Sequence, residues 1–154
     1  MTYENFKKPN AVVFDREGVM YPAEIDYQDN NQYIMIEIND INNRNVAHLD
    51  LVQDEKEPYY RIISSKVNHK LIKRKGIYTE LLKLAASLTT KIKLKRGSEY
   101  YKGIKSAADE RSGEAEYVWT SLYKNKDILG IDIIEKHPDH LPSDFPDKDY
   151  YLNG

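Results

Sequence analysis

The stretch from Tyr59 to Leu88 constrains the fold of this chain most, because it joins a strand pattern directly to a helix pattern. Residues 59–67 are rich in β-branched and aromatic residues, which favours a strand. From Gly76 onward, apolar residues recur at helical spacing and predict an amphipathic helix. These apolar residues are Ile77, Leu81, Ala85 and Leu88, with Leu82 and Leu84 widening the stripe.

The turn between the two patterns is basic and ends at Gly76. Its cationic residues are Lys70, Lys73, Arg74 and Lys75. Backbone N–H groups at the start of a helix have no partner within the helix, and the helix dipole adds partial positive charge there. The turn is therefore a candidate anion site. An ordinary strand-to-helix connection with solvated lysines is the alternative, and these residues alone do not decide between the two.

Charge is strongly segregated along the chain. Residues 61–106 carry 13 basic and 2 acidic side chains, a net charge of +11, whereas residues 1–60 carry −7 and residues 107–154 carry −6. A cationic block of this kind indicates a polyanionic partner or a phosphorylated small ligand. The pI near 6.1 is low for a protein that binds duplex nucleic acid. The small ligand is favoured, and nucleic acid is the least favoured partner.

Length and composition predict one soluble domain. The 154 residues are enough for a sizeable core, and we expect a single domain over 1–154, with its core at about 32–134 and a surface tail at 135–154. The absence of cysteine excludes disulfides and thiolate metal sites, and we expect no metal. No apolar run is long enough to span a membrane, and no signal-peptide pattern is present, so we expect a cytoplasmic protein without a membrane partner.

The remaining elements predict an α/β (α+β) fold built on a mixed, mostly antiparallel sheet flanked by helices. Residues 1–31 read as irregular apart from a short strand at 11–14, and the tail from Pro138 is expected to run over the surface. The following elements are predicted between them: strands at 33–38 and 46–52 joined by a hairpin at 39–45, and a strand at 91–95. A polar loop, or a loop with one helical turn, follows at 96–111, and then a helix starting at Ser112 and a closing strand at 127–134.

This order resembles the core of the GNAT superfamily of N-acetyltransferases over roughly residues 32–134. Family members carry Val, then Arg or Gln, two residues, Gly, one residue, and Gly or Ala. The matching residues here are Val67, Lys73, Gly76 and Tyr78. Lysine stands where Arg or Gln is usual, Tyr78 takes the small-residue position, and the spacing from Val67 to Gly76 is one residue longer.

The second predicted helix strengthens the resemblance. Its pattern combines Ser112, Ala115, the Val118-Trp119 pair and Leu122. It resembles the GNAT segment with Asn, two residues, Ala, three residues and Tyr, and is more similar still to a small branch often met in phage genomes. Serine is a good N-cap, which supports a helix start at Ser112.

The resemblance implies acetyl-CoA as cosubstrate and an unidentified amine as acceptor. It implies that the diphosphate of acetyl-CoA lies on the amides of residues 74–78 and that the pantetheine arm lies beside the strand ending at Val67. Ser112 would help to hold this arm. The implied cofactor-binding residues are Val67, Lys73, Arg74, Lys75, Gly76, Ile77, Tyr78 and Ser112. A homodimer is compatible with the sequence.

Acetyl transfer needs a base for the amine and often an acid for the leaving thiolate. Candidate bases are Glu37, His48, Asp50 and His69. The family's tyrosine acid is replaced by Trp119, an indole that cannot donate a proton at neutral pH, and Tyr123 lies one helical turn further on. No catalytic residue is assigned. The substitutions at Tyr78 and Trp119 leave open an alternative, a GNAT-fold binding module without transferase activity. A nucleic-acid binder using residues 61–106 is the third hypothesis.

Overall fold

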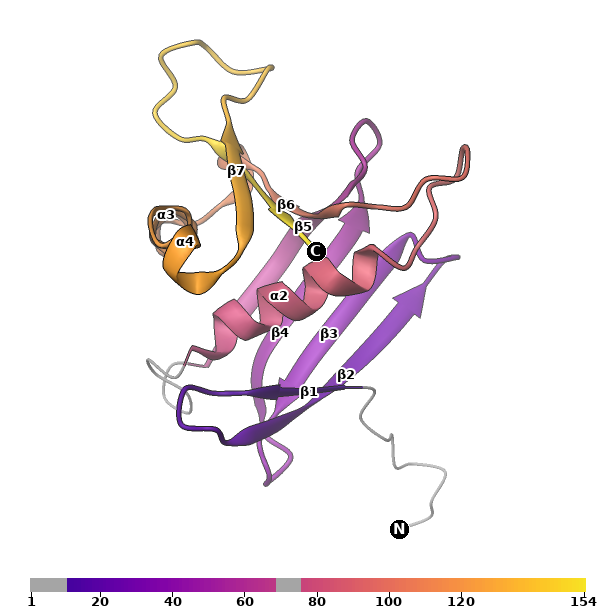
Figure 1. Ribbon diagram of the computed structural model, residues 1–154, viewed down its shortest axis with the longest axis vertical. Helices are drawn as coiled ribbons and strands as arrows, with labels where there is room; N and C mark the ends of the chain where they lie inside the picture. Colours follow the sequence, from indigo (N-terminus) through magenta and orange to yellow (C-terminus); the bar gives the residue numbers. More distant parts are fainter. Residues whose placement is uncertain (1–10, 69–75) are drawn as a thin grey trace.

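A computed structural model describes residues 11–68 and 76–154. Within these ranges the strands form one eight-stranded sheet in the order β1-β2-β3-β4-β5-β6-β8-β7 (Figure 1). The strands are β1 (Ala11–Phe14), β2 (Met20–Gln28), β3 (Tyr33–Asn39), β4 (Asn45–Gln53), β5 (Tyr59–Val67), β6 (Gly103–Ser106), β7 (Asp132–Lys136) and β8 (Asp149–Asn153). The helices are α2 (Ile77–Thr89), the 3-10 turn η2 (Ala108–Glu110), α3 (Gly113–Lys124) and α4 (Lys126–Leu129).

Every strand pair in the sheet is antiparallel except the parallel pair β5–β6. This arrangement confirms the predicted mixed, mostly antiparallel sheet with helices packed against it. The single parallel pair requires a crossover, which α2 provides between β5 and β6.

The predicted alternation in the central strands places one face of the sheet in the core. Ile34, Ile36 and Ile38 of β3 are fully buried, as are Leu49 and Leu51 of β4. The register pairs Ile34 with Leu51 and Ile36 with Leu49, so these side chains form one apolar surface.

Helix α2 covers this apolar surface, as Figure 1 shows. Its stripe of Ile77, Leu81, Leu82 and Ala85 is buried, as the helical periodicity predicts. Trp119 and Leu122 of α3 belong to the same cluster of buried side chains. No helix among the described residues is long and apolar enough to cross a bilayer.

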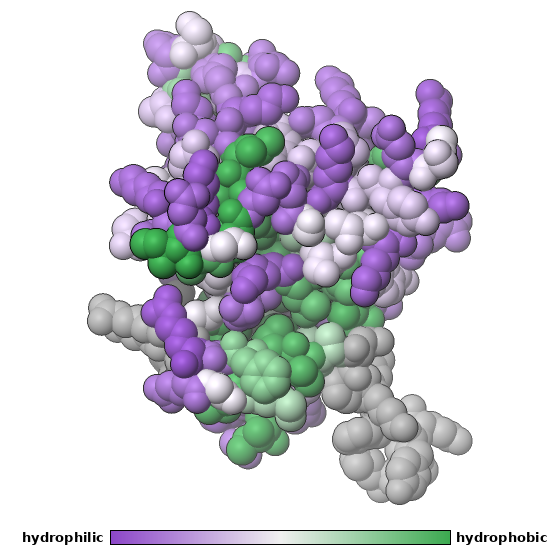
Figure 2. Space-filling model, viewed as in Figure 1, coloured by the Kyte–Doolittle hydropathy of each residue, from purple (hydrophilic) through white to green (hydrophobic). Residues whose placement is uncertain are grey.

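The opposite face of β2 to β4 carries polar residues. In the alternate positions of β3 and β4 lie Glu37, His48 and Asp50, and Glu37 pairs with His48 across the strands. Apolar side chains are exposed instead at the β1–β2 end, where Val12, Phe14 and Met20 are between 43% and 52% exposed. Figure 2 shows hydrophobic side chains in the lower part of the molecule, over this end of the sheet.

The ends of the chain were predicted wrongly. Residues 20–28 form the nine-residue strand β2 rather than irregular structure, while the predicted strand at 11–14 is confirmed as β1. Residues 149–153 are not a surface tail. They form β8, which lies between β6 and β7, and Tyr150, Tyr151 and Leu152 are at most 4% exposed. The sheet therefore extends beyond residues 32–134 in both directions.

Three predictions around the helices were also wrong. Residues 91–95 form no strand and contribute only an isolated bridge from Lys93 to Tyr100. The strand after α2 is β6, which lies within the segment predicted as a loop. The apolar run at 127–134 is split by Gly130, whose left-handed backbone ends α4 before β7 begins at Asp132.

Candidate functional site: the cleft between β5 and β6

The parallel strands β5 and β6 pair over only three residues and then separate. Tyr59, Tyr60 and Arg61 of β5 lie opposite Gly103, Ile104 and Lys105 of β6. Beyond this point β5 continues to Val67, and no other described strand pairs with this edge. The main-chain N–H and C=O groups of residues 62–65 along that edge are therefore available to a ligand.

A bulge in β5 lies at the same place. On the β4 side, Leu51 pairs with Ile62 and Asp50 pairs with Ser64, so Ile63 has no opposite residue. A bulge bends the strand and increases its twist. The bulge thus accompanies the separation of β5 from β6.

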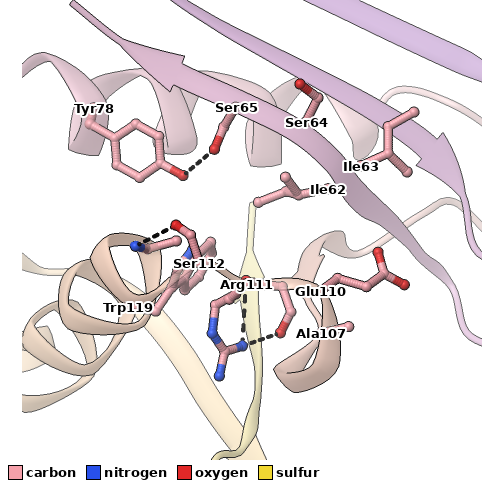
Figure 3. A pocket seen from close by; sticks show the side chains of 12 residues that line it. Ile62, Ile63, Ser64, Ser65, Tyr78, Ala107, Glu110, Arg111, Ser112 and Trp119 are labelled. Carbon is pink, nitrogen blue, oxygen red and sulfur yellow. Dashed lines mark hydrogen bonds between the residues drawn. The ribbon is translucent and has the colours of Figure 1, made fainter.

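The space between the strands is a cleft of about 200 Å³ (Figure 3). One wall is β5, and the other is the segment from the end of β6 to the start of α3, with α2 and α3 closing one side. The lining residues are Ile62, Ile63, Ser64, Ser65, Tyr78, Ser106, Ala107, Glu110, Arg111, Ser112, Ala115 and Trp119.

Tyr78 lies at the α2 end of the cleft and points toward β5 in Figure 3. Its hydroxyl donates a hydrogen bond of 3.3 Å to the Ser65 hydroxyl. Burial is the largest influence on the phenol and raises the pKa of Tyr78, whereas its contacts with Ser65 and Trp119 lower that pKa. The hydroxyl is therefore protonated at neutral pH and acts as a donor.

Ser112 forms the N-cap of α3, as predicted. Its Oγ accepts the Ala115 N–H at 3.3 Å. The preceding residue, Arg111, fixes this corner: its guanidinium donates to the Ser106 carbonyl at 2.7 Å and to the Glu116 carboxylate at 2.6 Å. The guanidinium also lies over the Tyr150 ring, 5.0 Å from the centroid. The wall opposite β5 is consequently held by a buried cation.

The N-terminus of α2 begins at Gly76, whose φ of 77° is in the left-handed region. Arg16, from the turn between β1 and β2, lies directly over this glycine. A Cβ atom at residue 76 would lie 3.0 Å from Arg16 Nε. Sequence reasoning missed Arg16, because its position depends on the strand β2 that was not predicted.

The structure brings together only some of the predicted cofactor-binding residues. Tyr78 and Ser112 line the same cleft, and Gly76 opens the adjacent helix. Val67 lies at the end of β5, paired with Ala47, and is not among the lining residues. Ile77 is 1% exposed and packs in the core. The remaining three, Lys73, Arg74 and Lys75, lie outside the described residues.

None of the candidate bases that the structure describes lines the cleft. Glu37, His48 and Asp50 lie on the uncovered face, and His48 Nδ1 is 3.9 Å from Asp50 Oδ2. Asp50 is the nearest of them in register, because it pairs with Ser64 at the bulge. His69 lies outside the described residues.

The two aromatic candidates on α3 differ in position. Trp119 is 1% exposed and fills the core, and one part of it borders the cleft. Tyr123 packs against Tyr150, with ring centroids 5.8 Å apart, and is not a lining residue. Chemically, the cleft offers main-chain donors and acceptors along β5 and hydroxyl groups from Ser64, Ser65 and Ser112, a set suited to an extended ligand with amide groups.

Comparison with known proteins gives a likeness of fold rather than of sequence. The sequence matches no family model, and no curated protein is significantly similar to it. Among solved structures, the fold is similar to an acetyltransferase of the GNAT family from Staphylococcus aureus Mu50, with a TM-score of 0.49 and 17% sequence identity. The match covers 80% of this chain and 69% of that chain.

Proposed function

We propose that the protein binds acetyl-CoA in the cleft between β5 and β6 and transfers the acetyl group to an amine. The observation that carries the proposal is the separation of β5 from β6 after Arg61, which leaves the edge of residues 62–65 open along a cleft. A pantetheine arm carries amide groups that match such an edge in the way an added strand does. The resemblance of residues 112–122 to a GNAT segment also supports this proposal. The same resemblance favours the small phage-type branch of that superfamily.

The negatively charged end of the ligand would lie at the start of α2. Unpaired N–H groups and the helix dipole favour an anion there, and Gly76 lets it approach the main chain. Arg16 places a guanidinium over the same glycine. Lys73, Arg74 and Lys75 directly precede it in the chain and would add charge.

In the proposed reaction, the amine nitrogen bonds to the thioester carbonyl carbon as the C–S bond breaks, and one proton passes overall from nitrogen to the leaving sulfur. The uncovered polar face of β3 and β4 is where an amine would approach the bulge. Asp50 would take the proton through water, because it lies outside the cleft but pairs with Ser64 at the bulge.

Binding is tested by thermal unfolding with and without millimolar acetyl-CoA. A ligand that binds only the folded state raises the melting temperature. We expect Gly76→Glu to abolish this increase, because it places a carboxylate and a strained backbone at the proposed phosphate position. Gly97→Glu is the matched control, since Gly97 also has a left-handed φ of 88° but no atom within 4 Å of its Cβ direction. An unchanged melting temperature of the wild-type protein would refute the proposal.

A binding module without transferase activity is the second candidate. It is favoured by the absence of the candidate bases Glu37, His48 and Asp50 from the cleft lining and by Trp119 at the position of the family's acid. Release of free thiol from acetyl-CoA in the presence of a panel of amines distinguishes the two functions. Binding without thiol release supports the module, and amine-dependent release supports the transferase.

A nucleic-acid binder using residues 61–106 ranks third. Two of its cations are engaged within the protein: Arg61 binds Glu110 and Lys105 binds Glu57, each at 2.6 Å. Retention on heparin with a steep dependence on salt would support this function. Elution at low salt would exclude it.

A further inference from the structure

The cleft is too small, as it stands, for the ligand that we propose. Its volume is about 200 Å³, whereas pockets for small molecules usually measure roughly 300–1,000 Å³. The main chain of β5 and the wall fixed by Arg111 are held by strand pairing and hydrogen bonds. A ligand arm therefore requires one of the lining side chains to move.

Tyr78 is the side chain whose movement would enlarge the cleft at the required place. It stands in the first turn of α2, so its ring lies between the cleft and the helix start where we place the diphosphate. In Figure 3 the ring reaches across this end of the cleft toward Ser65, with Trp119 below it. A ligand extending from the bulge to Gly76 would have to pass the position that this ring occupies.

The contact that holds the ring is weak enough to be reversible. The Tyr78 hydroxyl donates a hydrogen bond of 3.3 Å to the hydroxyl of Ser65, which is exposed to solvent, and it also interacts with the Trp119 side chain. A neutral hydrogen bond of this kind changes an equilibrium by about tenfold or less. When the Tyr78 ring turns away, it uncovers the Ser65 hydroxyl and the main-chain groups along the β5 edge. Both then face the ligand.

We propose that Tyr78 is a gate that closes the cleft against Ser65 and must turn outward before the thioester's arm can bind. This inference rests on the proposed function, because the ligand is coenzyme A. Only the fraction of molecules with an open gate binds, so the apparent dissociation constant exceeds the intrinsic one by the inverse of that fraction. Tyr78 stands where members of the GNAT superfamily have a small residue. The larger side chain thus lowers the affinity for coenzyme A without preventing binding.

Calorimetric titration with coenzyme A tests the gate in the wild type, three variants and one control variant. Tyr78→Phe removes the hydrogen bond that closes the cleft and keeps the ring, and we expect it to lower the dissociation constant about threefold. Ser65→Ala removes the same hydrogen bond together with a hydroxyl that faces the ligand, and we expect a smaller decrease. Tyr78→Ala also removes the ring, and we expect a decrease of about tenfold. The control is Tyr117→Ala, whose side chain is 76% exposed on α3 and which we expect to leave the affinity unchanged.

The single tryptophan gives a second readout that a merely structural role of Tyr78 would not alter. Trp119 lines the cleft beside Tyr78, and the protein has no other tryptophan. In stopped-flow fluorescence, the slope of the observed rate against coenzyme A concentration should be about tenfold larger for Tyr78→Ala than for the wild type, because a fast gate lowers the association rate constant by the open fraction.

The outcomes separate the gate from the proposed function. Binding by the wild type that is equal or tighter than binding by all three variants would overturn the gate and leave the function standing. Failure of the wild type and of all variants to bind coenzyme A would overturn both. Binding by Tyr78→Ala alone, with none by the wild type, would support a gate that is closed nearly all the time. Tyr78→Phe retains the ring, so its result stands even if Tyr78→Ala fails to fold.

Discussion

Arg61 Nη1 lies 2.6 Å from Glu110 Oε1, so an ion pair spans the point where β5 and β6 separate. Arg61 is the last residue of β5 that pairs with β6, and Glu110 ends η2 on the opposite wall. The cleft is therefore bounded at one end by this ion pair and at the other by the contact of Tyr78 with Ser65.

Removal of the ion pair should have a small and salt-dependent effect on stability. The side chains of Arg61 and Glu110 are 31% and 38% exposed, so Glu110→Gln should lower the free energy of unfolding by less than about 1 kcal/mol. Urea unfolding at low and high salt measures this difference, which should shrink as salt screens the charges. Glu55→Gln, on an exposed turn, serves as control. A decrease in the free energy of unfolding well above about 1 kcal/mol would mean that the ion pair is effectively desolvated.

Arg16 should contribute to binding of the charged end of coenzyme A. Its side chain lies over Gly76 at the start of α2, and Arg16→Ala should raise the dissociation constant about threefold, as expected for an exposed charge. The effect should diminish with added salt. Arg44→Ala is the matched control, because Arg44 lies in the β3–β4 turn and binds Asp40 at 2.8 Å. Equal affinities of the two variants would place the phosphates elsewhere.

Stability should fall steeply above pH 10. Tyr60 is fully buried, and burial raises its pKa to about 12. The unfolded chain loses this proton near pH 10 while the folded protein keeps it. The stabilisation that the protonated Tyr60 contributes is therefore complete below pH 10. It is lost as pH rises toward 12, where the free energy of unfolding falls by about 1.4 kcal/mol per pH unit.

Urea unfolding between pH 9 and pH 11.5 measures this slope, and Tyr60→Phe should flatten it by the equivalent of about one proton. Tyr117→Phe, at a 76% exposed position, should leave the slope as in the wild type. Parallel curves for all three proteins would show that Tyr60 ionises equally in both states.

Leu152, in strand β8, should be important for stability. It is 2% exposed in β8, opposite Ile104 on one side and Ile133 on the other. Leu152→Ala should cost about 2–5 kcal/mol, the usual range for a buried leucine. Ile128→Ala, at an 88% exposed position, should change stability by less than about 0.5 kcal/mol. Similar losses for both would contradict the placement of β8 inside the sheet.

The sequence predicted the elements whose burial is one-sided. β3, β4 and α2 each bury one face against the core, so their apolar residues repeat at intervals of 2 or 3.6, and their bounds were found almost correctly. The start of α3 was predicted because Ser112 caps it through its side chain, which is a local signal.

Elements without such periodicity were missed. β8 is buried on both faces, so Tyr150, Tyr151 and Leu152 do not alternate with polar residues. β2 contains Pro22, which argues against a strand by its missing N–H group, yet the strand tolerates it opposite Val12 of the edge strand β1. In both cases the partners in the sheet decide the structure.

The candidate site was only partly predictable for the same reason. Tyr78 and Ser112 were named because the resemblance to the GNAT superfamily implied them, but that they line one cleft follows from the crossover between β5 and β6. No local sequence pattern marks Arg16. Its contact with Gly76 joins the β1–β2 turn to the start of α2, and these two segments are far apart in the sequence. The contact of Tyr78 with Ser65 joins side chains 13 positions apart and depends on the strand and helix packing together.

The insertion of β8 between β6 and β7 has a consequence for synthesis on the ribosome. A nascent chain extended as far as Lys136 contains both neighbours of β8 but not the strand that joins them, so their facing edges stay unpaired until residues 149–153 emerge. The meander from β1 to β5 has no such dependence and forms from contacts between adjacent segments. We therefore expect the β6 side of the cleft to take shape after the meander.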